Sequence, residues 1–169
     1  VEPVRMATGG RTTAKRKLSS FLTNSLERYH LDRNSVENSA VSGLSPWLHF
    51  GHISSIEIVE QILEQSEWTP DHIDMSRKGS REGWWGLSQG VESFLDQIIT
   101  WRELGFNNAY HNEDHNKFES IPEWAKKCLA EHSDGERVLF TVVQLANAES
   151  DDEIWNAAQN QLVRTGIIH

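Results

Sequence analysis

The segment Ser42-Gly43-Leu44-Ser45-Pro46 combines two hydroxyls, a glycine and a proline in a pattern that suits an anion-binding turn. Ser45 is a favourable helix N-cap and Pro46 fits the first helical position. Backbone N–H groups and hydroxyls would then meet at the positive end of a helix, where a pyrophosphate can bind. Plain helix capping explains the same residues, so the spacing alone leaves both interpretations open.

A second candidate anion site lies near the start of the chain, where Gly9 and Gly10 precede Arg11. The spacing is not that of the phosphate-binding loop of nucleotide hydrolases, so either a helix start or a simple anion site remains. Residues 1–33 carry seven Lys or Arg against three acids, whereas residues 113–153 carry eleven acids against four bases. We therefore expect a basic surface around Arg11 and Lys15 that suits phosphate, with solvated helix faces as the alternative.

Metal and nucleophile chemistry find little support in the sequence. His111 and His115 lie four residues apart but lack the glutamate that zinc proteases place after the first histidine. His49 and His52 lie three residues apart, and Gly51 between them interrupts a shared helix face. Cys128 is the single cysteine and has no motif partner. We expect structural or surface histidines, no metal and no cysteine nucleophile.

Two tryptophans stand beside polar groups that suit a flat ligand. Trp101 precedes Arg102, and an indole next to a guanidinium fits either a planar ligand with phosphates or ordinary packing. Trp155 and Asn156 precede two alanines, which allow a flat ring or another helix to approach closely.

The elements that must position these residues are helices. Apolar residues recur every three or four positions over 11–29, 53–63 and 91–104, and again after Ser120 and Ser150. Serine followed three residues later by glutamate predicts capping boxes at Ser54, Ser120 and Ser150. Residues 138–145 favour helix over strand only moderately. The sequence predicts an all-α fold.

The connections are uneven. Residues 68–90 are rich in glycine and serine, which is typical of a surface crossover or of a loop over a ligand. Near the end, Gly166 suits a helix C-cap, and Ile167 and Ile168 resemble the start of another buried segment. This ending predicts a chain that stops inside a larger fold.

Composition limits the classes of protein further. Hydrophobic residues make up 37% and charged residues 24% of the 169 positions, and no window approaches a membrane span. The net charge of -9 argues against non-specific nucleic-acid binding by the whole surface. We expect no membrane partner and a cytoplasmic location, and the sequence leaves a nuclear one open.

Taken in order, several segments resemble the FAD-binding helical domain of the DNA photolyase and cryptochrome family, most closely class II cyclobutane pyrimidine dimer photolyases. The matching stretches are GGRTTAKRKLSSFL, YHLDRNSVENSAVSGLSPWLHFGHIS, FLDQIITWRELGFN, IPEWAKKCLAEH and IWNAAQNQLVRTGIIH. Together they cover most of the chain in the family's order, which makes the set specific although each piece alone is not.

The resemblance implies a reduced FAD, held in a U shape, that absorbs blue or near-ultraviolet light and donates an electron to a pyrimidine dimer flipped out of damaged DNA. By position, Tyr29 matches an aromatic near the FAD phosphates. The four residues from Ser42 to Ser45 match the loop around the pyrophosphate, and Arg102 matches an arginine near the flavin.

The resemblance also implies contacts with DNA. Trp101 matches the aromatic beside the flipped lesion, and the helix with Trp155 and Asn156 matches one that lines the cavity. Arg11 and Lys15 would face a phosphate of FAD or of DNA. No residue is assigned as catalytic.

Departures from the family pattern limit what carries over. Val41 stands where many members have threonine, and Ile98 stands where class I members have a lesion-contacting glutamate. If the class II register applies, the neighbouring Gln97 would serve in that place, and we group it with the cofactor-binding residues. The antenna domain and the family's later motifs are absent, so residues 1–169 are expected to form a partial FAD-binding domain. We expect the isolated chain to be inactive and its truncated face to be open to self-association.

Three functions remain open at this point. The first is a deoxyribodipyrimidine photolyase, a light-driven DNA repair lyase, of which this chain is a fragment or truncated member. The second is a cryptochrome-type flavin photoreceptor, and the third is a helical interaction module that has lost flavin.

Overall fold

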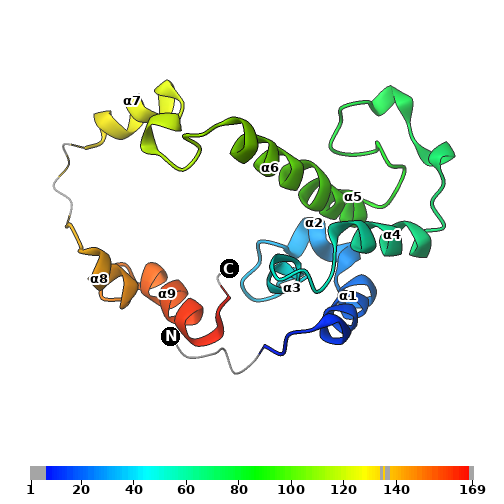
Figure 1. Cartoon of the computed structure of the whole chain (residues 1–169), viewed down its shortest axis with the longest axis horizontal. Coiled ribbons are helices and arrows are strands. Elements are labelled where there is room, and N and C mark those ends of the chain that lie inside the picture. Colours follow the sequence, from blue (N-terminus) through cyan, green and yellow to red (C-terminus); the bar gives the residue numbers. More distant parts are fainter. Residues whose placement is uncertain (1–6, 134, 136–137, 168–169) are drawn as a thin grey trace. The chain divides into compact units, whose positions relative to one another are not determined.

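The computed structural model describes residues 7–133, 135 and 138–167 (Figure 1). All regular structure in this described part is helical, which confirms the all-α prediction. Residues Thr8–Asn108 form one compact unit, here called the first unit, and the chain from Ala109 onward belongs to a second unit. Among the described residues, no helix is both long and apolar enough to span a membrane.

The first unit contains the residues of most interest for function. Its helices are α1 (Arg11–Asn24), η1 (Leu26–Arg28), α2 (Tyr29–Asp32), α3 (Ser45–His49), α4 (Ser55–Gln65), η2 (Pro70–His72), η3 (Met75–Arg77), α5 (Gln89–Leu95) and η4 (Asp96–Trp101), and α6 (Arg102–His111) continues into the second unit along the chain.

The apolar stripe of α1 forms one wall of the core. Ala14, Leu18, Phe21 and Leu22 are buried, as their spacing predicts. The predicted single helix to Tyr29 is wrong, however, because α1 ends at Asn24 and a 3₁₀ turn follows. Asparagine competes with the helix backbone for hydrogen bonds, and the Asn24 amide donates to the Ser20 carbonyl at 2.9 Å. The turn still leaves Leu26 buried against the same core.

The second wall is α4, and it differs from its prediction in two ways. Ile58 and Ile62 face the core, whereas Ile56 is 69% exposed. Ser54 does cap the helix by accepting from the Glu57 N–H at 3.1 Å. The Glu57 side chain does not complete the predicted capping box, because it binds Arg11 instead.

The α5 and η4 segments complete the core with Val91, Phe94, Leu95 and Ile98. Leu104, predicted in the same stripe, is 54% exposed. The stripe loses its register because η4 is a π-helix, which widens each turn and rotates the residues that follow.

The crossover from 66 to 88 is held down by one buried carboxylate. Glu92 is 1% exposed, and its oxygens accept from the backbone N–H groups of Gly83, Trp85 and Leu87. The Trp68 indole also donates to the Trp85 carbonyl at 2.8 Å. The loop is therefore fixed to α5.

The second unit contains η5 (Phe118–Ser120), α7 (Glu123–Glu131), α8 (Val142–Ala146) and α9 (Glu153–Thr165). The capping prediction at Ser150 is wrong, because Asp152 accepts from the Ile154 and Trp155 N–H groups. The one at Ser120 is wrong as well, since α7 begins after Pro122 without a side-chain cap.

Other features of the second unit follow the sequence more closely. Gly166 ends α9 in the left-handed conformation, at φ 70°, as predicted. The helix within 138–145 is confirmed from Val142 onward, and Thr141 and Gln144 cap it reciprocally. Trp124 is 75% exposed, so the predicted stripe of α7 is not buried in this unit. Ile167 is half exposed, and Ile168 lies outside the described residues.

Candidate functional site

The carboxylate of Asp96 forms hydrogen bonds with two predicted site residues of the first unit. Its Oδ2 accepts from the Trp101 indole N–H at 3.0 Å and from the Gln97 amide at 3.4 Å. The Arg81 guanidinium, from the crossover loop, lies 3.4 Å from the same oxygen. Sequence reasoning missed both Asp96 and Arg81, because nothing local to either residue signals their contact.

Tyr29 lies in an aromatic cluster beside this carboxylate. Its ring packs edge-on against Phe94, with centroids 5.2 Å apart, and against Phe21 at 6.1 Å. Burial raises the pKa of the Tyr29 phenol above 10.0, and Asp96 adds to the increase. Arg33 opposes the shift in pKa without cancelling it. The phenol therefore keeps its proton, and its capacity to donate a hydrogen bond, at neutral pH.

The raised pKa predicts how stability depends on pH. Well below pH 10.0 the Tyr29 phenol is neutral in both the folded and the unfolded chain, so its burial contributes in full to the free energy of unfolding. As the pH rises, the phenol ionises first in the unfolded chain. The free energy of unfolding therefore falls until the pH has passed the pKa of the folded state. Tyr29→Phe should flatten this alkaline loss, measured by urea unfolding on either side of pH 10.0. Tyr110→Phe is the control because Tyr110 is 84% exposed. Equal slopes for Tyr29→Phe and the parent chain would contradict the assignment.

The Ser42–Ser45 segment forms a turn next to an ammonium group. Gly43 has φ +61°, and the Lys17 Nζ lies 3.6 Å from where a Cβ at Gly43 would stand. The same Nζ lies 5.1 Å from the Trp47 ring centroid. No carboxylate among the described residues pairs with Lys17. Lys17 is a further residue that sequence reasoning missed.

The details of this turn differ from the predicted cap. Helix α3 begins at Ser45 itself, with Leu44 as the N-cap residue and no side-chain capping bond. The Ser42 hydroxyl accepts from the Leu44 N–H at 3.4 Å. Leu44 is fully buried, which anchors the turn to the core. The predicted N-cap role of Ser45 is therefore wrong, because the fixed Leu44 starts the helix one residue earlier.

Arg102 lies at the start of α6, on the residue after Trp101. Its guanidinium pairs with the neighbouring Glu103 and lies 4.6 Å from the Phe106 ring centroid. Its side chain is 38% exposed. The group is therefore held against an aromatic ring while part of it faces solvent.

The predicted basic surface of α1 is partly neutralised. Arg11 donates two hydrogen bonds to the Glu57 carboxylate, at 2.8 and 2.9 Å, and the Lys15 Nζ lies 3.6 Å from it. This fork geometry is the strong form of an arginine–carboxylate pair. One acid thus holds both predicted phosphate-binding residues.

The two predicted residues of α9 are engaged within the second unit. The Trp155 indole donates to the Leu145 carbonyl at 3.3 Å. Asn156 donates to the Ser150 carbonyl at 2.7 Å and accepts from the Ser150 hydroxyl at 2.8 Å. These bonds fix α9 to the segment before it.

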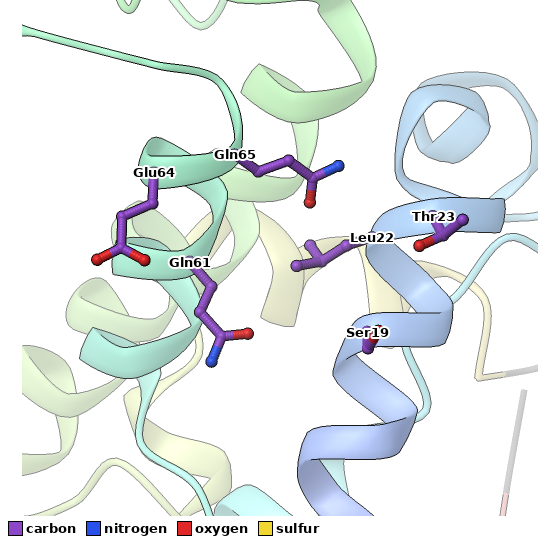
Figure 2. Close-up of a pocket in the computed structure, with 6 residues that line it drawn as sticks. All are labelled: Ser19, Leu22, Thr23, Gln61, Glu64 and Gln65. Atoms are coloured by element: carbon purple, nitrogen blue, oxygen red, sulfur yellow. The ribbon is translucent and has the colours of Figure 1, made fainter.

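A polar pocket of about 430 Å³ lies between α1 and α4 in the first unit (Figure 2). Leu22 and Gln65 point into the space between the helices, and Glu64 points away from α1. The remaining lining residues are Ser19, Thr23 and Gln61. No predicted site residue lines this pocket.

The histidines do not assemble a metal site in the described part of the chain, where no group of three or more His, Cys, Asp or Glu side chains could hold an ion. His115 instead contacts the Asn112 carbonyl through Nδ1 at 2.9 Å. His132 contacts the Cys128 carbonyl in the same way at 2.7 Å.

These observations define an all-α protein whose first unit carries a candidate site of aromatic and cationic side chains. No family model matches the chain. A deoxyribodipyrimidine photo-lyase of Potorous tridactylus is 29% identical over the whole chain and 29% of its own length. The photo-lyase of Oryza sativa subsp. japonica is 32% identical over 88% of this chain, which corresponds to 26% of its own length. That of Methanothermobacter thermautotrophicus is 30% identical over 95% of this chain, which corresponds to 31% of its own length.

The chain is therefore a photolyase-family sequence. It spans between 26% and 31% of the length of these curated relatives. The prediction of the family is confirmed.

Proposed function

We propose that the chain forms part of a deoxyribodipyrimidine photolyase, in which it helps to bind FAD and a pyrimidine dimer in damaged DNA. The observation that carries this proposal is the similarity of the whole chain to photolyases. Bound and reduced, FAD supplies the electron that opens the cyclobutane ring of the dimer.

The donors of the first unit fit the anionic part of FAD. A diphosphate needs cations, hydroxyls and exposed backbone N–H groups. The turn at Gly43 lies next to the Lys17 ammonium, and its neighbour Ser42 carries a hydroxyl that accepts from the Leu44 N–H. Tyr29 contributes a phenol that remains protonated at neutral pH. In this proposal, Lys17 and Ser42 bind the diphosphate, and Tyr29 and Arg102 orient the rest of the cofactor.

The indole of Trp101 suits the other ligand. It is 56% exposed, and an exposed aromatic face stacks on any base. A dimer already disrupts base stacking, which lowers the cost of extruding it from the duplex. Gln97, fixed beside Trp101 through Asp96, would then bind a polar edge of the extruded bases.

A chimera tests the proposal. This chain replaces the matching segment of the Methanothermobacter photolyase, and the product is assayed for FAD absorbance and for blue-light repair of a dimer-containing oligonucleotide. We expect both.

Lys17→Ala should weaken FAD binding by about tenfold, as loss of a charge-assisted bond implies. Arg16→Ala, exposed on the same helix, should leave it unchanged.

The other outcomes separate the alternatives. A folded chimera that binds FAD without repairing dimers favours a cryptochrome-type photoreceptor. A folded chimera without FAD favours a helical interaction module and contradicts the proposal.

The Glu57 contacts predict a gain in DNA binding. Glu57→Gln removes the charge that neutralises Arg11 and Lys15, so both become available to phosphate. Affinity for duplex DNA should rise at low salt, and the log–log salt dependence should steepen by roughly one unit for each further DNA phosphate that these side chains bind. Glu60→Gln, on the exposed face of the same helix, controls for net charge. Equal effects of both variants would leave Arg11 and Lys15 without a specific role.

A further inference from the structure

The π-helical turn η4 places side chains five residues apart next to one another. A π-helix bonds each residue to the fifth one along, and such turns often occur at functional sites. Asp96 and Trp101 are five residues apart, at the two ends of η4. The Trp101 indole N–H therefore reaches the Asp96 carboxylate at 3.0 Å, a contact within η4 that the spacing of an α-helix does not favour.

Asp96 is itself held in place. Its side chain is 9% exposed, and the Arg81 guanidinium approaches it at 3.4 Å from the crossover loop. That loop is fixed to α5 through Glu92, one helical turn before Asp96. Asp96 thus forms an ion pair with the crossover loop and hydrogen bonds within η4, which leaves its carboxylate little freedom to move.

Trp101 has the opposite character, because its polar side-chain atom is bound while the residue as a whole is 56% exposed. A free surface indole samples several rotamers, and binding a flat ligand must then fix one of them at a cost in entropy. A hydrogen bond that fixes the indole beforehand reduces that cost. Stacking of a base on an aromatic ring contributes about tenfold or more to affinity.

We propose that Asp96 is a positioning residue that acts through Trp101. It fixes the indole so that the exposed face can stack on an extruded base, and Arg81 fixes Asp96 in turn. The role in base stacking rests on the proposed function, whereas the fixed indole rests on the geometry alone.

The first test is independent of DNA. The seven tryptophans give seven indole N–H resonances in a ¹⁵N-labelled chain, and Trp101→Phe identifies one of them. Asp96→Ala should shift that resonance and speed its exchange with solvent, leaving the other six unchanged. Asp96→Asn retains a carbonyl acceptor and should have a smaller effect. Asp71→Ala, an exposed acid in η2, should have none.

The second test measures the affinity of the chimera described above for a dimer-containing oligonucleotide. Trp101→Ala should weaken binding about tenfold, and Asp96→Ala by a smaller factor. The double variant should bind no more weakly than Trp101→Ala, because Asp96 acts only through the indole. If Asp96→Ala fails to fold, Asp96→Asn and Arg81→Gln take its place in both tests, since Arg81 is 64% exposed.

Each result decides a different point. An unchanged Trp101 resonance in Asp96→Ala overturns the proposal. So does an unchanged affinity in Asp96→Ala when Trp101→Ala binds more weakly, or losses that simply add in the double variant. If the unsubstituted chimera shows no preference for the dimer, the proposed function fails and with it the role in stacking, and the NMR result still decides whether Asp96 fixes Trp101.

Discussion

Gly90→Ala should destabilise the first unit by about 3 kcal/mol, at the upper end of what overpacking costs. Gly90 is buried near the start of α5, and a Cβ there would meet the backbone carbonyl oxygens of Leu26 and Glu27. Backbone atoms of a packed turn cannot move aside as a flexible side chain can. We therefore expect α5 and η1 to separate, which a shift in the urea unfolding midpoint would show.

Gly105→Ala is the matched control for this prediction. Gly105 lies inside α6, and a Cβ there meets nothing within 4 Å. The same chemical change should stabilise the chain by about 0.5–1 kcal/mol, because alanine favours helix more than glycine does. A Gly90→Ala chain as stable as the parent would contradict the close approach of α5 and η1.

Glu92→Ala should cost about 3 kcal/mol and release the crossover loop, because three backbone N–H groups, those of Gly83, Trp85 and Leu87, would lose their acceptor. Each hydrogen bond to a charged group contributes about 1.5–3 kcal/mol, but the desolvation of the carboxylate offsets part of the sum. Urea unfolding gives the change in stability, and hydrogen exchange over residues 83–87 reports the release of the loop.

Two further variants make this prediction sharper. Glu92→Gln retains one carbonyl oxygen but loses the acceptor for Gly83, so it should cost roughly half as much as Glu92→Ala. Glu60→Ala removes an exposed carboxylate from α4 and should change stability by less than about 0.5 kcal/mol. Equal exchange rates in Glu92→Ala and the parent would show that the loop is held by other contacts.

Local signals in the sequence predicted the helices and most of the core. The spacing of Ala14, Leu18 and Phe21 is a property of one helix, and it places them on one face wherever the helix packs. The same reasoning failed in α4, where the predicted stripe contained Ile56 and not Ile58. Packing against the other helices buries Ile58 and leaves Ile56 exposed.

Among the candidate site residues, motifs identified Tyr29, the Ser42–Ser45 turn, Gln97 and Trp101, whose segments match the family. Their partners were not predictable from the sequence. The sequence around Asp96 and Glu92 does not distinguish them from other acidic residues in helices, and Lys17 is one of several basic residues on α1. Apart from the bonds of Asp96 within η4, each of these contacts joins segments that are separate in the chain.

The sequence by itself therefore determined the helical class, which follows from local periodicity, and the family, which follows from the resemblance of its ordered motifs. The same motifs predicted which segments carry the candidate site. Only the tertiary structure decided that Glu57 neutralises Arg11, that Lys17 approaches Gly43, and that Asp96 joins Arg81 to Trp101. Ion pairs and hydrogen bonds depend on distances between atoms. Those distances are set when the helices pack, and no residue encodes them alone.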